Sequence, residues 1–236
     1  MRWTVAQLRR TLPLLIAKGE TLNVARKVCG RIYSEKTWYV LRREPGIPFI
    51  PPPPKIPIRV RAVDKSDYPA IIEEHPARIP ALEAGLATCY VAETSDGEIC
   101  YMQWLIDSGQ NDLIMKEFKG MCSPLKDGEM MLEWAYTFKK YRGFGVMAPA
   151  MSAISEQGAA KGASSLITFV EHNNIPSLKG CRSAGYRPYR IRRDRWRLFR
   201  KKEQYISLSP DAKYPFESDA EPQRETASIP TERRAI

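Results

Sequence analysis

One stretch in the second half of the chain limits its possible folds more than any other feature. Met131 to Phe138 has the pattern of a strand, Gly143 to Lys161 that of a helix, and Ser165 to Glu171 that of a buried strand. A strand, a helix and a strand in this order form a right-handed crossover between parallel strands. We therefore expect one parallel pair of strands with a helix packed across one face of the sheet.

The strands before this crossover are expected to be antiparallel. Thr88 to Glu93 and Ile99 to Ile106 flank Asp96-Gly97, a dipeptide that is a strong signal for a hairpin turn. After the crossover, Tyr186 to Arg193 and Arg195 to Lys202 have strand patterns that would close the sheet. The sequence thus predicts an α/β fold of the α+β type, whose central mixed sheet has about six or seven mostly antiparallel strands.

A run of prolines divides the chain near its N-terminus. Residues 45–57 include Pro51-Pro52-Pro53-Pro54, and a segment so rich in proline is expected to be an extended, stiff connector. Before it, residues 1–44 are predicted to form a small helical N-terminal extension that ends in a short strand over Lys36 to Arg43. The main domain is then expected to begin after the connector.

This domain is predicted to span residues 58–203, beginning with a strand over Ile58 to Val63. The segment that follows, 204–236, is rich in Pro, Glu, Asp, Ser and Arg and offers few apolar residues to bury. Such a composition is typical of a disordered tail. We therefore expect one folded domain with an extension at each end.

Cysteines and histidines are sparse. The five cysteines are widely spaced without a Cys-x-x-Cys pair, and there are two histidines, so we expect neither a disulfide framework nor a metal site. These features fit a cytoplasmic protein. The longest apolar runs are far shorter than the roughly 18 residues of a membrane span, and no secretory signal is recognisable. The arginine-rich first helix could still lie on an anionic membrane surface.

A formal net charge of +10 favours anionic partners. Much of the excess lies in residues 187–202, where apolar and aromatic residues interrupt the arginines and lysines. This pattern predicts two strands with basic outer faces. A solvated or cofactor-attracting face explains it better than a nucleic-acid surface, so we do not expect nucleic acid as a partner.

The segment Arg142-Gly143-Phe144-Gly145-Val146-Met147 joins the predicted strand to the predicted helix. Its glycines would let backbone N–H groups approach a ligand at the positive end of that helix. Lys139, Lys140 and Arg142 add positive charge beside the loop. The segment therefore predicts a binding site for an anionic group such as a pyrophosphate.

The same loop also satisfies a dinucleotide-binding pattern. Gly143-x-Gly145-x-x-Ala148 reads as G-x-G-x-x-A, and Glu171 ends the next strand about where a ribose-binding acid would lie. That fold requires repeated strand-helix units, whereas antiparallel strands precede this loop. The context therefore argues against a Rossmann domain.

The loop resembles the Arg/Gln-x-x-Gly-x-Gly/Ala signature of the GNAT superfamily of acyl-CoA-dependent N-acyltransferases. The resemblance extends from about Ile58 to Lys202 in the order and type of elements. A second segment, Asn174-Ile-Pro-Ser-Leu-Lys-Gly-Cys-Arg-Ser-Ala-Gly-Tyr186, is similar to the family's Asn, small-residue, Tyr and Gly-Phe positions. The sequence departs from the pattern at Met147, where the family prefers Gly or Ala, and at Cys181, where it often has tyrosine.

This resemblance implies direct transfer of an acyl group from acetyl-CoA or another acyl-CoA to an amine on a small molecule, sugar or peptide. Backbone N–H groups near a splay in the strand that ends at Thr137-Phe138 would hold the thioester carbonyl. The residues implied in cofactor binding are Thr137, Phe138, Arg142, Gly143, Phe144, Gly145, Val146, Met147 and Asn174.

Two residues are candidates for catalysis. Attack requires a neutral amine, and Glu133 is the best-placed base, although a structural role beside a surface arginine stays open. Strand alternation is expected to put Glu133 and Trp134 on opposite faces of the sheet. Cys181 could protonate the departing thiolate or simply pack as a small buried residue. Trp104 could line the acceptor site, although core packing is the simpler interpretation.

An alternative function is a catalytically inactive binding module of the same fold. Such a module would use its basic face on nucleic acid or on an anionic membrane. Release of CoA in the presence of amines would indicate an enzyme, whereas salt-sensitive binding to nucleic acid or vesicles would favour the binding module.

Overall fold

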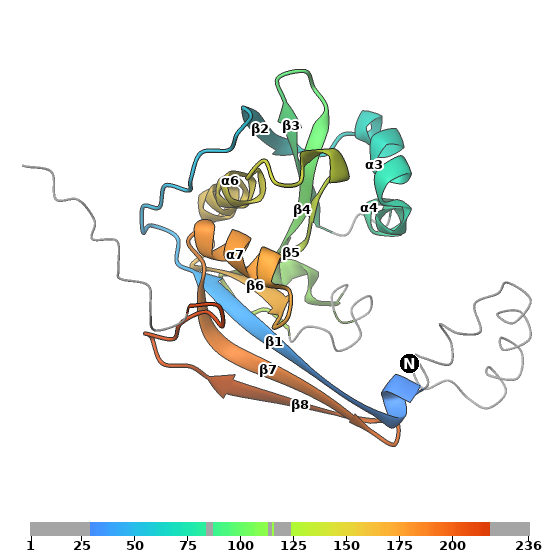
Figure 1. The fold of residues 1–236 in the computed structure, drawn as a ribbon, viewed down its shortest axis with the longest axis vertical. Coiled ribbons are helices and arrows are strands. Elements are labelled where there is room, and N and C mark those ends of the chain that lie inside the picture. Colours follow the sequence, from blue (N-terminus) through green and yellow to red (C-terminus); the bar gives the residue numbers. More distant parts are fainter. Residues whose placement is uncertain (1–28, 84–86, 113–114, 116–123, 218–236) are drawn as a thin grey trace, which may run out of the picture.

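The computed structural model describes residues 29–83, 87–112, 115 and 124–217 (Figure 1). The helices predicted before residue 29 and the last residues of the predicted tail lie outside this range. No helix among the described residues is long and apolar enough to cross a membrane. Within the same residues, no group of three or more His, Cys, Asp and Glu side chains is placed to hold a metal ion.

Within the described residues, eight strands form one mixed sheet, in the order β2-β3-β4-β5-β6-β1-β7-β8. Among these described strands, β5 and β6 pair in parallel, whereas all other neighbours are antiparallel. This arrangement confirms the predicted fold class, including the single parallel crossover. The strands are β1 (Tyr33–Arg43), β2 (Ile58–Ala62), β3 (Thr88–Thr94), β4 (Ile99–Asp107), β5 (Glu129–Thr137), β6 (Ser165–Glu171), β7 (Arg187–Arg197) and β8 (Arg200–Ser207).

Strand β1 belongs to the sheet and not to an N-terminal extension, so the predicted boundary at residue 44 is wrong for this strand. It lies between β6 and β7 and is antiparallel to both. Val40 and Leu41 are almost completely buried, and Leu41 belongs to the same core cluster as the rest of the sheet. The proline connector is thus a link between two strands of one domain.

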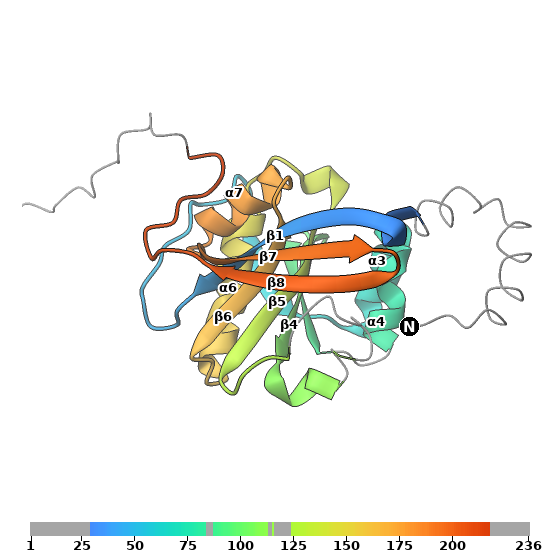
Figure 2. The same ribbon diagram turned by 90° about the horizontal axis from the view of Figure 1, so that it is seen from below.

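Helices cover both faces of the sheet. In Figures 1 and 2, α6 and α7 lie on one face of the central strands, and α3 and α4 lie on the other. The helix bounds are α3 (Tyr68–Glu74), α4 (Ile79–Glu83), α6 (Met147–Ala160) and α7 (Ile175–Ser183), with short 3-10 helices at Lys65–Asp67, Pro76–Arg78, Ser108–Gln110 and Lys139–Tyr141. The two faces are called the α6 face and the α3 face below.

The segment after β8 packs against α7, so the prediction of a disordered tail from residue 204 is wrong for the described part. Strand β8 itself runs to Ser207. Tyr214 is 4% exposed, and its hydroxyl donates to the backbone oxygen of Tyr186 at 2.7 Å. Arg182 of α7 forms an ion pair with Glu217 at 2.8 Å. The average composition of the segment did not predict this contact, because a single buried tyrosine is enough to hold a polar segment against the domain.

Candidate functional site

Strands β5 and β6 pair over only a short distance. Glu129 to Met131 of β5 lie opposite Ser165 to Ile167 of β6, and beyond these residues the two strands run on without pairing to each other. The predicted splay is therefore present. Glu133 lies just past its start, and its carboxylate accepts a hydrogen bond at 3.2 Å from the backbone N–H of Phe169 in β6.

A β-bulge interrupts β5 immediately after Glu133. Met102 of β4 pairs with Tyr136 and Trp104 pairs with Glu133, so β5 has one extra residue between these pairs. The extra residue is accommodated at Trp134, whose backbone adopts the left-handed region with φ of +58°. A bulge leaves part of the backbone outside the ladder, which makes N–H groups available to a ligand beside the splay.

The bulge overturns the predicted alternation of side chains. The Trp134 ring packs edge-on against Trp104, at 5.3 Å between centroids, and Trp104 lies opposite Glu133 in the ladder. Arg78, from the 3-10 helix before α4, lies over the same Trp134 ring at 4.9 Å. Glu133 and Trp134 therefore both project toward the α3 face, because the extra residue breaks the two-residue period.

Burial raises the pKa of Glu133 from 4.5 to about 7. Hydrogen bonds from the backbone N–H groups of Phe169 and Trp134, and the charge of Arg78, act in the opposite direction but do not offset the desolvation. A carboxylate with a pKa near neutrality can accept a proton and release it again under ordinary conditions.

The predicted anion-binding loop lies between β5 and α6. Gly143 and Gly145 have φ of +83° and +74°, which explains why α6 begins at Met147 and not at Gly143 as predicted. A Cβ atom added at Gly143 would meet no heavy atom within 4 Å. Val146, which precedes the helix, makes no capping bond through its side chain. The positive end of α6 is thus approachable by an anionic group.

Arg142 lies at the outer edge of this loop. Its Nε donates to the Thr137 backbone oxygen at 3.3 Å, and its guanidinium lies 5.6 Å from the Tyr136 ring centroid. The side chain is exposed, so it keeps donors for a phosphate. Lys140 instead forms an ion pair with Glu98.

The proline connector reaches the loop, which the sequence did not indicate. The backbone N–H of Lys55 donates to the Phe144 oxygen at 2.9 Å. A Cβ atom added at Gly145 would lie 3.9 Å from Pro54 Cα. The connector therefore forms a wall of the loop, a contact between distant segments that local patterns could not predict.

The second predicted motif forms α7. Asn174 caps this helix through its side-chain oxygen, which accepts from the Ser177 N–H at 3.3 Å. Gly180 faces Met147 closely enough that an added Cβ would collide with the Met147 sulfur. The absence of a side chain at Gly180 thus makes room for Met147, one of the two departures from the family pattern.

Cys181, the other departure, is 1% exposed. Burial raises the pKa of its thiol well above the usual range, and the nearby charge of Glu133 acts in the same direction.

The Phe138 N–H, expected near the thioester carbonyl, donates instead to the Cys100 oxygen at 3.0 Å. A role for this N–H as a donor to a ligand is therefore not supported.

No protein-family model matches the chain, and no curated protein matches it. Among solved structures, a Drosophila protein is similar over 84% of this chain and 58% of its own, with 16% identity and a TM-score of 0.49. A GNAT-family acetyltransferase from Colwellia psychrerythraea is similar over 74% of this chain and 61% of its own, with 12% identity and a TM-score of 0.48. A Bacillus subtilis acetyltransferase in complex with CoA is similar over 56% of this chain and 77% of its own, with 13% identity and a TM-score of 0.41.

Proposed function

We propose that the chain is an acyl-CoA-dependent N-acyltransferase that transfers the acyl group, an acetyl group in the simplest case, directly to an amine. One observation carries this proposal. The glycine loop and the uncapped end of α6 directly follow the half of β5 that is unpaired from β6, where Glu133 is located. An anion site and a proton acceptor are thus joined by one continuous segment.

The pyrophosphate of the acyl-CoA is assigned to the backbone N–H groups of Gly143 and of residues 145–147, since the Phe144 N–H already donates to the Tyr141 oxygen at 3.3 Å. A pyrophosphate fits here for two reasons. A Cβ atom added at Gly143 would meet no heavy atom within 4 Å, and no side chain caps the start of α6 at Val146, so both positions leave room for an anion. Arg142 would contribute charge from the outer edge of the loop. Asn174, as the cap of α7, would position that helix beside the cofactor without contacting it.

In the proposed reaction, the amine nitrogen attacks the thioester carbon, the C–S bond breaks and the CoA thiolate leaves. Glu133 takes the proton that the amine loses. The developing negative charge on the carbonyl oxygen would be stabilised by the Ala135 N–H, since Ala135 is exposed next to the bulge and the Trp134 N–H already binds Glu133. Cys181 is assigned to packing, because its buried thiol is a poor acid.

The test measures binding of acetyl-CoA by calorimetry to the wild type, Gly145→Glu and Gly145→Ala. Both variants place a Cβ at a positive φ, with a similar strain of about 1–2 kcal/mol. Only Gly145→Glu adds a negative charge to the phosphate site. We expect Gly145→Ala to retain binding and Gly145→Glu to lose it.

Equal affinity of the two folded variants would contradict the assignment of the loop. Turnover is then measured as CoA release with a panel of amines. Binding of acetyl-CoA without turnover of any amine would favour the inactive binding module over the enzyme.

A further inference from the structure

The α3 face of the sheet carries a cluster of four side chains that includes the proposed base. Trp104 is fully buried and lies opposite Glu133. Trp134 packs against Trp104, and Arg78 lies over Trp134. We call Arg78, Trp104, Glu133 and Trp134 the acceptor cluster.

Two donors of the acceptor cluster are buried without a hydrogen-bond partner. They are Nε of Arg78 and Nε1 of Trp104. Among the described residues, Arg78 also forms no ion pair, and its charge is felt by Glu133 and Cys89 only at longer range. Buried N–H donors are rarely left unpaired in folded proteins, so a ligand that accepts hydrogen bonds from both would be stabilised here.

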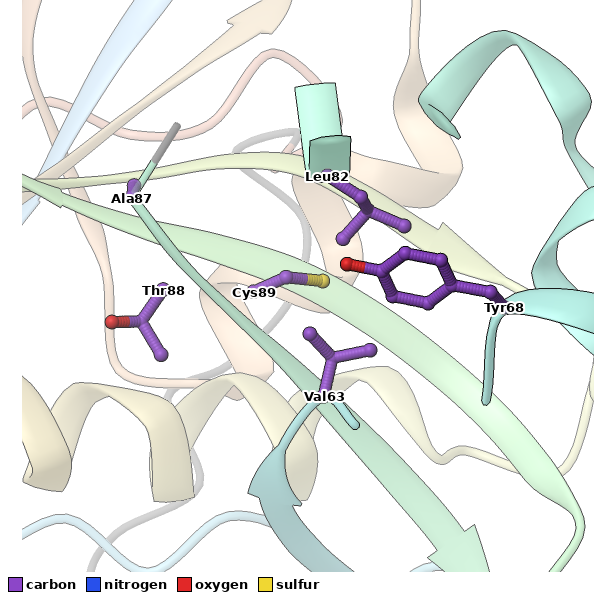
Figure 3. Close-up of a pocket in the computed structure, with 6 residues that line it drawn as sticks. All are labelled: Val63, Tyr68, Leu82, Ala87, Thr88 and Cys89. Atoms are coloured by element: carbon purple, nitrogen blue, oxygen red, sulfur yellow. The ribbon is translucent and has the colours of Figure 1, made fainter. Parts of the chain in front are cut away.

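A cavity of about 260 Å³ lies on the same face. Figure 3 shows its lining residues, with the Tyr68 hydroxyl pointing toward the Cys89 sulfur. Cys89 is the residue of β3 that lies opposite Trp104, so the cavity adjoins the acceptor cluster across one strand pair. Its volume fits part of a small molecule and is too small for a macromolecule.

We propose that the amine acceptor carries a carboxylate, held by Arg78 and Trp104 on the α3 face so that its amine lies at Glu133. This inference rests on the proposed function. A planar guanidinium matches the two oxygens of a carboxylate, and the indole N–H adds one further donor. A carboxylate only accepts hydrogen bonds, as both orphan donors require.

The arrangement has an electrostatic consequence for the reaction. Arg78 lowers the pKa of Glu133, against the larger effect of burial. A bound carboxylate would neutralise Arg78 and weaken this effect. Glu133 therefore becomes a stronger base when the acceptor is in place.

The test compares two reaction products of similar size and shape, the anion N-acetylglycine and its neutral amide. Neither carries a titrating amine, so differences in amine pKa do not enter. Their binding to the full chain is measured by calorimetry in the presence of CoA. We expect the wild type to prefer the acid, and Arg78→Gln to weaken the acid by about 10- to 100-fold while leaving the amide unchanged.

Arg190→Gln serves as the matched control. Arg190 also lies over an aromatic ring, 5.3 Å from the centroid of Tyr189, but it belongs to β7. We expect no change in either affinity. Trp104→Phe is a second variant, which keeps an aromatic ring but removes the indole N–H, and it should weaken the acid by about 5-fold.

Equal affinity of the wild type for acid and amide, or no binding of either, would overturn the inference. An equal loss of affinity for acid and amide in Arg78→Gln would overturn it too, because it would indicate that Arg78 has a packing role and that water satisfies its donors. Tighter binding of the corresponding phosphonate than of the acid would overturn the choice of carboxylate. Turnover of neutral amines alongside any of these results would leave the acyltransferase proposal intact, whereas wild-type protein that fails to bind acetyl-CoA would refute that proposal itself.

Discussion

Replacing Glu133 by glutamine should make the protein less sensitive to pH. The pKa of Glu133 is raised by burial from 4.5 to about 7, so between these values the folded state holds a proton that the unfolded state has released. Stability of the wild type therefore falls as the pH rises through this window and is level above it. The rise in pKa corresponds to about 3 kcal/mol of unfolding free energy.

Glutamine carries no titrating proton, so the stability of Glu133→Gln does not fall in this way as the pH rises. The free energy of unfolding of the variant, relative to the wild type, should increase by about 3 kcal/mol from pH 4.5 to pH 8. Urea unfolding at a series of pH values, followed by tryptophan fluorescence, measures this difference. A flat difference, or a relative loss of stability in the variant as the pH rises, would show that Phe169 and Arg78 keep Glu133 ionised.

The same variant tests the proposed base. Wild-type turnover should rise as Glu133 loses its proton near pH 7, whereas Glu133→Gln should be slow at neutral pH and recover at alkaline pH, where the amine is itself deprotonated. CoA affinity should barely change. Identical pH-rate profiles for the two proteins would exclude Glu133 as the base.

Two further predictions concern residues around α7. Cys181→Ala should retain most activity, because the buried thiol is assigned to packing; a hundredfold loss in kcat with intact CoA affinity would make Cys181 catalytic. Tyr214→Ala should destabilise the protein by about 3–5 kcal/mol and Tyr214→Phe by about 1–2 kcal/mol, since the first removes a buried ring and the second only its hydrogen bond to Tyr186. Unchanged melting temperatures in both would mean that this segment does not stabilise the domain.

Features set by local chemistry could be predicted from the sequence. Gly143 and Gly145 between a strand and a helix indicated the loop, because few other residues adopt positive φ there. Asp96-Gly97 indicated the hairpin for a similar reason. The parallel crossover followed from the order of its elements.

Features set by contacts between distant segments could not. The bulge depends on a positive φ at Trp134, and the residues next to Trp134 in the sequence give no signal for this conformation. The contact of Pro54 and Lys55 with the loop, and the position of Arg78 over Trp134, depend on how whole elements pack. The sequence therefore indicated the strand that carries the candidate base, but strand alternation wrongly placed Glu133 and Trp134 on opposite faces of the sheet.

The place of β1 in the sheet has a consequence for how the protein is made. Its partners, β6 and β7, are encoded far downstream, and at about 5–20 residues per second the ribosome needs on the order of 10 s to produce them after β1 has emerged. During that time Trp38 to Leu41 have neither neighbour. Strands β3, β4 and β5 can pair before β1 has a partner, so the nascent chain exposes an aromatic strand that only β6 and β7 can cover.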